Sequence, residues 1–124
     1  MDLREGFAGT VGGTPLIRLP RISAEVGAEI LGKADVITSG NHIWDKKETQ
    51  PYIGRQRRLL RPHNYPKTTP GRGWYVFESA NGHAVGVLNL MGRVFMDPVD
   101  CPFQAADKVL AEKPEHVTTV FVDM

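Results

Sequence analysis

The sequence has little of what marks several classes of protein. Its 124 residues include one cysteine, Cys101, which excludes an intrachain disulfide and a cluster of thiolate ligands for zinc. No apolar run approaches the roughly 20 residues that a bilayer-spanning helix needs. Residues 1–5 also lack the basic start and apolar core of a signal peptide. We therefore expect a protein without a membrane segment, located in the cytoplasm.

The sequence also has no excess of charge, because its formal net charge is only +1 at pH 7. This balance makes nucleic acid an unexpected partner. One basic run, residues 55–61, favours either a contact with phosphate or a solvated surface. The length fits a single domain over residues 1–124, and a hydrophobic content of 41% is ordinary for a globular chain.

Short runs of apolar and β-branched residues predict strands separated by turns. The expected strands are residues 14–19, 29–33, 35–38, 58–61, 74–79, 83–90 and 117–122, the last of a buried type. Between two of them, Asn81-Gly82 predicts a hairpin with a primed turn. A short helix is expected around residues 44–52, and a longer one from Phe103 to Lys113 with Phe103, Ala106, Val109 and Leu110 on one face. The pattern predicts an α/β fold.

Polar residues follow several of these strands directly. The residues are Asn41, His42, Asn64, Asn89, Arg93 and Asp123. Functional groups of open α/β sheets gather beyond the carboxyl ends of the strands. If the strands form a common sheet, we expect these side chains to converge on one rim.

The run Gly40-Asn41-His42 after residues 35–38 resembles the Gly-Asn-His motif of calcineurin-like metallophosphoesterases. The match is closest to the YmdB-like cyclic-nucleotide phosphodiesterases, and it covers residues 34–123. It continues through residues 59–66, 69–73, 89–95 and 121–123. The resemblance implies a truncated metallophosphoesterase-like sheet with flanking helices and a phosphodiester substrate such as a cyclic nucleotide.

The same resemblance implies roles for individual residues. Asn41 matches a metal ligand, with Mn, Zn or Fe as the expected divalent ion, and His42 matches the residue that acts on the substrate. An imidazole there can protonate the leaving alkoxide. The relatives also use an Asp, a Glu and three histidines that have no counterpart here, so the remaining ligands must come from this chain or from a second copy.

Replacement ligands are chosen by spacing and position. Asp45 lies three residues after His42, on the same helical face, and Asp123 follows the last strand, so both are predicted metal ligands. Asn64 and Arg93 are the predicted contacts to substrate. Glu48, His63, His83 and His116 are weaker candidates, more typical of exposed side chains, and Cys101 is expected to be a small apolar residue.

Residues 10–19 and 27–34 resemble a second family, the start of cysteine synthase, a pyridoxal-phosphate enzyme. No pyridoxal phosphate is expected, because the Lys segment that binds it does not follow. The sequence therefore predicts a chimera joined around Lys33 and Ala34, whose exposed sheet edges are covered in a homo-oligomer, a dimer or an assembly of dimers. Two alternatives stay open: a recombined fragment without catalysis, and a phosphate or nucleotide binder using Arg61, Arg72 or Arg93.

Overall fold

The computed structural model describes residues 3–5, 16–18, 31–32, 35–45, 47, 49–96 and 98–124. Its elements follow in chain order. They are β1 (Leu3–Glu5), β2 (Leu16–Arg18), β3 (Leu31–Gly32), β4 (Ile37–Thr38), the 3-10 helix η2 (Asn41–Trp44), α2 (Thr49–Arg55), β5 (Leu59–Leu60), β6 (Trp74–Glu78), β7 (Ala84–Asn89), α3 (Pro102–Glu112) and β8 (Thr119–Asp123). The predicted mixture of strands and helices is confirmed. Within the described ranges, no helix is long and apolar enough to cross a membrane.

The first three strands form a small sheet of their own, in the order β1-β2-β3. β1 runs parallel to β2, and β2 runs antiparallel to β3. The strand expected at residues 29–33 therefore pairs with the strand expected at 14–19, and β4 pairs with β5. The predicted junction at Lys33 and Ala34 and the weaker candidate Glu48 lie outside the described residues.

The main sheet has the order β6-β7-β8, with β6 antiparallel and β8 parallel to β7. The hairpin predicted at Asn81-Gly82 is confirmed, but the predicted primed turn is wrong. Only Gly82 of the pair has a positive φ, at 77°. The Gly82 N–H donates to the Ser79 carbonyl at 2.9 Å, and the Ser79 N–H donates to the His83 carbonyl at 2.8 Å. A single left-handed glycine closing a tight turn is the pattern of a longer hairpin loop.

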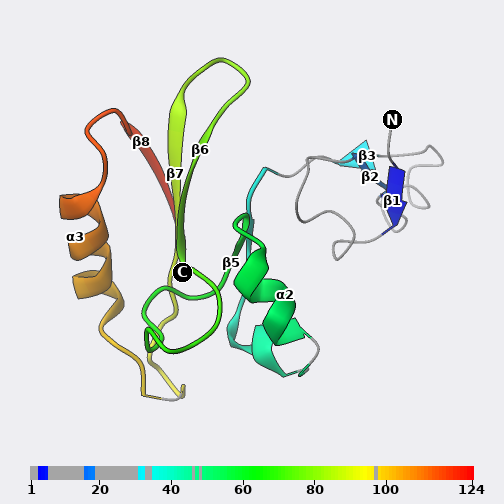
Figure 1. Cartoon of the computed structure of the whole chain (residues 1–124). Helices are drawn as coiled ribbons and strands as arrows, with labels where there is room; N and C mark the ends of the chain where they lie inside the picture. Colours follow the sequence, from blue (N-terminus) through cyan, green and yellow to red (C-terminus); the bar gives the residue numbers. More distant parts are fainter. Residues whose placement is uncertain are drawn as a thin grey trace.

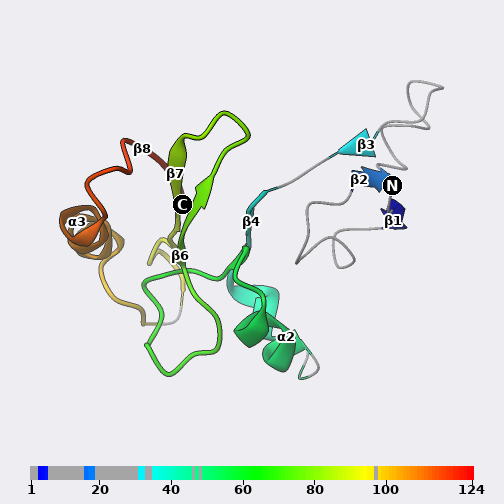
Figure 2. The ribbon, with the colours of Figure 1, turned by 45° about the horizontal axis from the view of Figure 1, so that its top comes forward.

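β4 and β5 form a parallel pair that the loop after β5 connects to the main sheet. The Arg61 N–H donates to the Arg72 carbonyl at 2.9 Å, and the His63 N–H donates to the Asn89 carbonyl at 2.7 Å. A Cβ atom at Gly73 would collide with the backbone of His63, so glycine permits this close approach. Figures 1 and 2 show α3 on one side of the main sheet and α2 beside β5 on the other.

The core lies between the main sheet and α3. Leu88, Leu90 and Val109 form its buried cluster, against which Trp74 and two alanines of α3 pack. α3 uses Val109 as predicted. The expected apolar face is wider than the observed one, because Phe103 is 68% exposed and Leu110 is 40% exposed.

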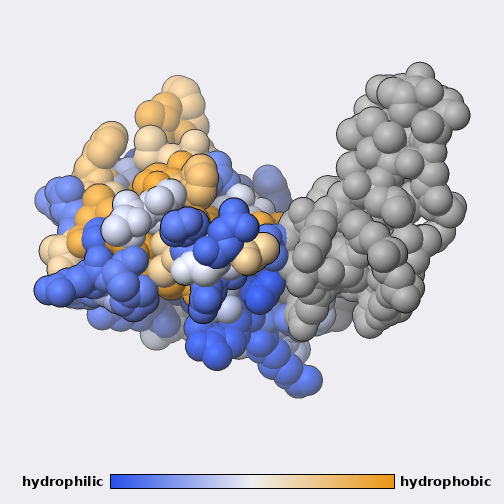
Figure 3. All heavy atoms as spheres, turned by 90° about the horizontal axis from the view of Figure 1, so that it is seen from above, coloured by the Kyte–Doolittle hydropathy of each residue, from blue (hydrophilic) through white to orange (hydrophobic). Residues whose placement is uncertain are grey.

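β8 differs most from its predicted burial. We expected a buried strand, but Phe121 and Val122 are 64% and 52% exposed, and only Val117, before the strand, is fully buried. In the described chain β8 is an edge strand of its sheet, beside β7. Apolar residues are accordingly visible on the surface in Figure 3.

Candidate active site

The Gly-Asn-His segment turns sharply as β4 ends. Gly40 is extended, at φ −88° and ψ −170°, and the 3-10 helix η2 begins at the next residue. The Ser39 hydroxyl donates to the Leu60 carbonyl at 2.7 Å, which ties the start of the turn to the end of β5. At the other end of η2, the Trp44 indole N–H donates to the Pro70 carbonyl at 3.4 Å. Both ends of the segment that carries His42 are thus fixed to neighbouring backbone.

His42 projects from this turn with a carboxylate beside its ring. Its Nδ1 lies 2.9 Å from Oδ2 of Asp45, and the two side chains are 82% and 63% exposed. The three-residue spacing does bring them together, as predicted. A carboxylate at Nδ1 fixes the tautomer and the orientation of an imidazole, and it leaves Nε2 as the nitrogen that can reach a substrate. The arrangement can deliver a proton from solvent-exposed Nε2 to a bound oxygen.

Asn89 connects the strand ends that form the predicted rim. Its Nδ2 donates to the Ser39 carbonyl at 2.7 Å and to the Leu60 carbonyl at 3.0 Å, beyond the ends of β4 and β5. It also stands opposite Asp123 in the parallel register of β7 and β8. The ends of β4, β5 and β7 therefore meet at Asn89, whereas the convergence of the predicted site side chains on one rim stays a prediction. Asn89 is 2% exposed, and its side-chain amide is used to hold neighbouring backbone.

Asn64 is also placed near this rim, but it is turned inward and is only 1% exposed. Its Nδ2 donates to the carbonyls of Met91 at 2.8 Å and Asp100 at 2.9 Å. Its Oδ1 accepts from the Met91 N–H at 2.9 Å. Both amide hydrogens are thereby used, and the side chain links the loop after β5 to the segment before α3. The predicted contact with substrate stays a prediction.

The other predicted site residues are spread out. Arg93 is exposed in the loop after β7 and lines a groove of about 600 Å³ with Val94, Phe103 and Met124. Asn41 and His42 do not line this groove. Asp123 is exposed at the end of β8, where its carbonyl accepts from the Leu90 N–H at 2.8 Å.

A metal would need several donors at one point. Among the residues that the structure describes, no group of three His, Cys, Asp or Glu side chains could hold a metal ion. Asp45 faces His42, and the metal site expected from Asn41, Asp45 and Asp123 stays a prediction.

Comparison with known proteins gives the family. Residues 23–124 match the model of the family described as YmdB-like protein. This chain belongs to the YmdB-like family. A 2',3'-cyclic-nucleotide 2'-phosphodiesterase of Bacillus subtilis is 46% identical over 90 residues, which are 73% of this chain and 34% of that protein. The predicted resemblance is confirmed, and the match to the family model begins before Ala34.

Two solved structures share the fold of this YmdB-like chain. A hypothetical protein from Thermus thermophilus matches with a TM-score of 0.64 and 37% identity, over 83% of this chain and 37% of that one. A phosphatase from Mycoplasma pneumoniae matches with a TM-score of 0.61 and 23% identity, over 84% of this chain and 37% of that one. The chain thus spans about a third of the length of these relatives and of the Bacillus enzyme.

The second resemblance is found as well. Cysteine synthase 1 of Neurospora crassa is 43% identical over 63 residues, which are 48% of this chain and 16% of that protein. This share and the share matched by the Bacillus enzyme add up to more than the whole chain, so the two matched segments overlap. A junction at Lys33 and Ala34 stays a prediction.

The sequence left two features of this region unrecognised. Asn89 was only one of several polar residues predicted at strand ends. No pattern in the sequence shows that its amide connects β7 with the ends of β4 and β5. Cys101 was expected to be merely a small apolar residue, yet it is the N-cap of α3. The signal was Pro102, because proline is common at the first helical position and so identifies the residue before it as the cap.

Proposed function

We propose that the protein hydrolyses phosphodiesters, with 2',3'-cyclic nucleotides as the substrate class, and that His42 is the general acid. The observation that carries the proposal is the exposed His42 imidazole, held at Nδ1 by Asp45 at 2.9 Å within the family's Gly-Asn-His turn. The activity printed for the Bacillus relative supports the choice of substrate.

The proposed reaction moves one proton through His42. Water attacks phosphorus, the bond from phosphorus to one ribose oxygen breaks, and the departing alkoxide takes the proton from Nε2. The attacking water loses its own proton to solvent. The Asp45 carboxylate accepts the Nδ1 hydrogen bond and stabilises the charged imidazolium before transfer. Its contact with the ring favours this positioning role over the metal-ligand role predicted from spacing.

The remaining assignments belong to the same proposal. Asn41 and Asp123 are proposed to contribute to a divalent metal site, and Arg93 to contact the phosphodiester. The family resemblance is the reason to test Mn, Zn and Fe. Activity that appears with one of these ions and disappears with a chelator would support an enzyme over a phosphate binder or a fragment without catalysis.

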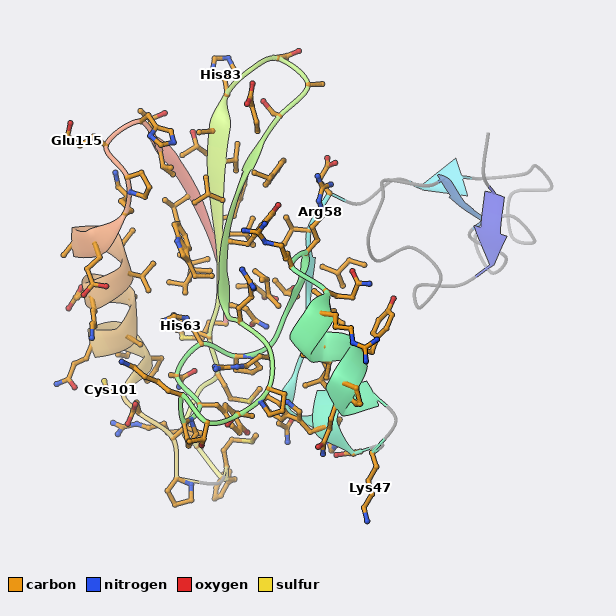
Figure 4. The ribbon with its side chains drawn as sticks, viewed as in Figure 1. Lys47, Arg58, His63, His83, Cys101 and Glu115 are labelled. Atoms are coloured by element: carbon orange, nitrogen blue, oxygen red, sulfur yellow. The ribbon has the colours of Figure 1, made fainter. Side chains whose placement is uncertain are left out.

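The test of the general acid is His42→Ala. We expect turnover of 2',3'-cyclic nucleotides to fall by about 100-fold or more, because general acid catalysis contributes on that order. His83→Ala is the matched control, since His83 is exposed at the hairpin tip, away from η2 (Figure 4). Circular dichroism checks that both variants fold. Near-normal turnover in His42→Ala would remove His42 from the mechanism.

A self-associating protein is the second candidate. The exposed Phe121 and Val122 of β8 favour it, because an apolar edge strand in water tends to pair with another strand. We propose a homo-oligomer, a dimer or an assembly of dimers, in which these residues are covered. Light scattering is the measurement, and a stable monomer at micromolar concentration would contradict this proposal.

A further inference from the structure

A second cavity, of about 530 Å³, lies beside the start of α3. Arg61, His63, Lys67, Trp74, Cys101 and Lys108 are among the residues that line it. Asn41, His42 and Asp45 do not line it, although Asn64 does. In Figure 4, His63 and Cys101 both lie on the α3 side of the main sheet. The volume falls within the roughly 300–1,000 Å³ typical of sites for small molecules.

Arg61 brings a buried positive charge to this cavity. The residue is only 6% exposed, and its guanidinium donates to the backbone carbonyls of Pro62, His63 and Thr69. Its Nε has no hydrogen-bond partner. No carboxylate of a described residue forms an ion pair with it, because the ion pairs found there involve other cations. A buried charge without a counter-charge is costly, so the site favours an anion.

Two titratable groups that line the cavity have lowered pKa values, for different reasons. Burial, followed by the charges of Arg61 and Lys108, lowers the pKa of His63. The backbone N–H of Gln104 is the main cause of a lowered pKa of the Cys101 thiol, although Cys101 makes no regular side-chain capping hydrogen bond. Burial is thus the larger cause at His63, with the fixed cations second, whereas backbone dipoles act at Cys101.

The cavity also contains negative charge, and the balance is still positive. Asp100 and Glu112 line it together with the three cations. Glu112 lies 4.0 Å from Lys108, one turn away on the exposed side of α3, and both side chains are more than 60% exposed. Such a surface pair is weak and readily exchanges for a stronger partner. Lys108 is therefore available to a ligand.

We propose that this cavity binds the phosphate group of a small molecule, held by Lys67 and Lys108 above the buried charge of Arg61. Lysine side chains are recurrent partners of phosphate. Trp74 provides an apolar wall on which a nucleoside could rest. The ligand is either inorganic phosphate or the phosphate monoester of a nucleotide.

Cys101 provides the measurement, because it is the only cysteine of the chain and it lines the cavity. The rate of its alkylation by iodoacetamide is measured with increasing inorganic phosphate, with a nucleoside monophosphate, and with chloride at equal ionic strength. We expect both phosphate compounds to slow alkylation at least threefold, and chloride to have no such effect. Stronger protection by the nucleotide than by phosphate identifies a nucleotide site, and equal protection identifies a phosphate site.

Substitutions test the assigned residues. Lys108→Gln should weaken protection by phosphate about tenfold, the loss expected for one charged partner. Lys47→Gln is the matched control, since Lys47 is exposed and far from the cavity in Figure 4. Circular dichroism of each variant confirms folding. Equal alkylation rates in phosphate and chloride, or unchanged protection in Lys108→Gln, would overturn the proposal. The result does not depend on His42.

Discussion

Two loops leave parallel strands at the same rim of the molecule, and their polar residues serve opposite purposes. His42, after β4, is 82% exposed and has a carboxylate as its side-chain partner. Asn64, after β5, is 1% exposed and makes three hydrogen bonds to backbone. A polar side chain beyond a strand end can therefore either remain exposed for chemistry or stabilise the fold. It stabilises the fold where backbone carbonyls and N–H groups lie close enough to take up its hydrogen bonds. The following predictions test this division.

Asn64→Ala should have the largest effect on folding. It removes three hydrogen bonds to the part-buried backbone of Met91 and Asp100, at a cost of about 3 kcal/mol. Urea denaturation measures the change in the free energy of unfolding. His42→Ala should change it by less than about 0.5 kcal/mol, as expected for an exposed site. Equal losses in the two variants would break the comparison.

Asn89→Ala should combine both effects. The loss of one buried and one part-buried hydrogen bond should lower the free energy of unfolding by about 2 kcal/mol. Turnover should fall too, because the Ser39 carbonyl that precedes the Gly-Asn-His turn is released. Asn81→Ala, at the exposed hairpin tip, is the control for both measurements. A stability loss with normal turnover would show that the turn holds its geometry without Asn89.

The sequence predicted the local elements well because their signals are local. Asn81-Gly82 marked the hairpin, and the apolar residues from Phe103 onward marked α3, which begins one residue earlier. The burial of β8 was not predictable, because an apolar run has the same appearance whether or not another layer covers it. Phe121 and Val122 belong to such an apolar run, and they are exposed.

The candidate site was predictable in part. The spacing of His42 and Asp45 correctly indicated that they meet. Spacing could not show that the amide of Asn64 is consumed by carbonyls 27 and 36 residues away in the chain. The cavity beside α3 likewise joins Arg61 to Cys101, two residues that no short motif connects. Contacts between distant residues depend on the tertiary fold.

Asp45→Asn tests the role of the carboxylate beside the exposed His42. An amide in place of the carboxylate no longer balances the charge of the imidazolium, so we expect turnover to fall about tenfold, less than in His42→Ala. Glu115→Gln, exposed after α3, is the control (Figure 4). Activity is titrated with metal in parallel. Lower turnover at an unchanged metal midpoint supports the positioning role, whereas a shifted midpoint would make Asp45 a ligand.

His63→Gln tests the structural side and should have the smallest effect. His63 is half-buried, and burial, followed by the charge of Arg61, lowers its pKa in the folded protein below the ordinary value of 6.5. As the pH falls below 6.5, the unfolded chain binds a proton that the folded protein resists, so the free energy of unfolding decreases until the pH passes the lowered folded pKa. Urea denaturation at several pH values should therefore show a shallower acid loss in His63→Gln than in the unsubstituted protein. His83→Gln, at the exposed hairpin tip, should keep the steeper loss, and equal slopes in all three proteins would show that burial at His63 does not contribute to acid sensitivity.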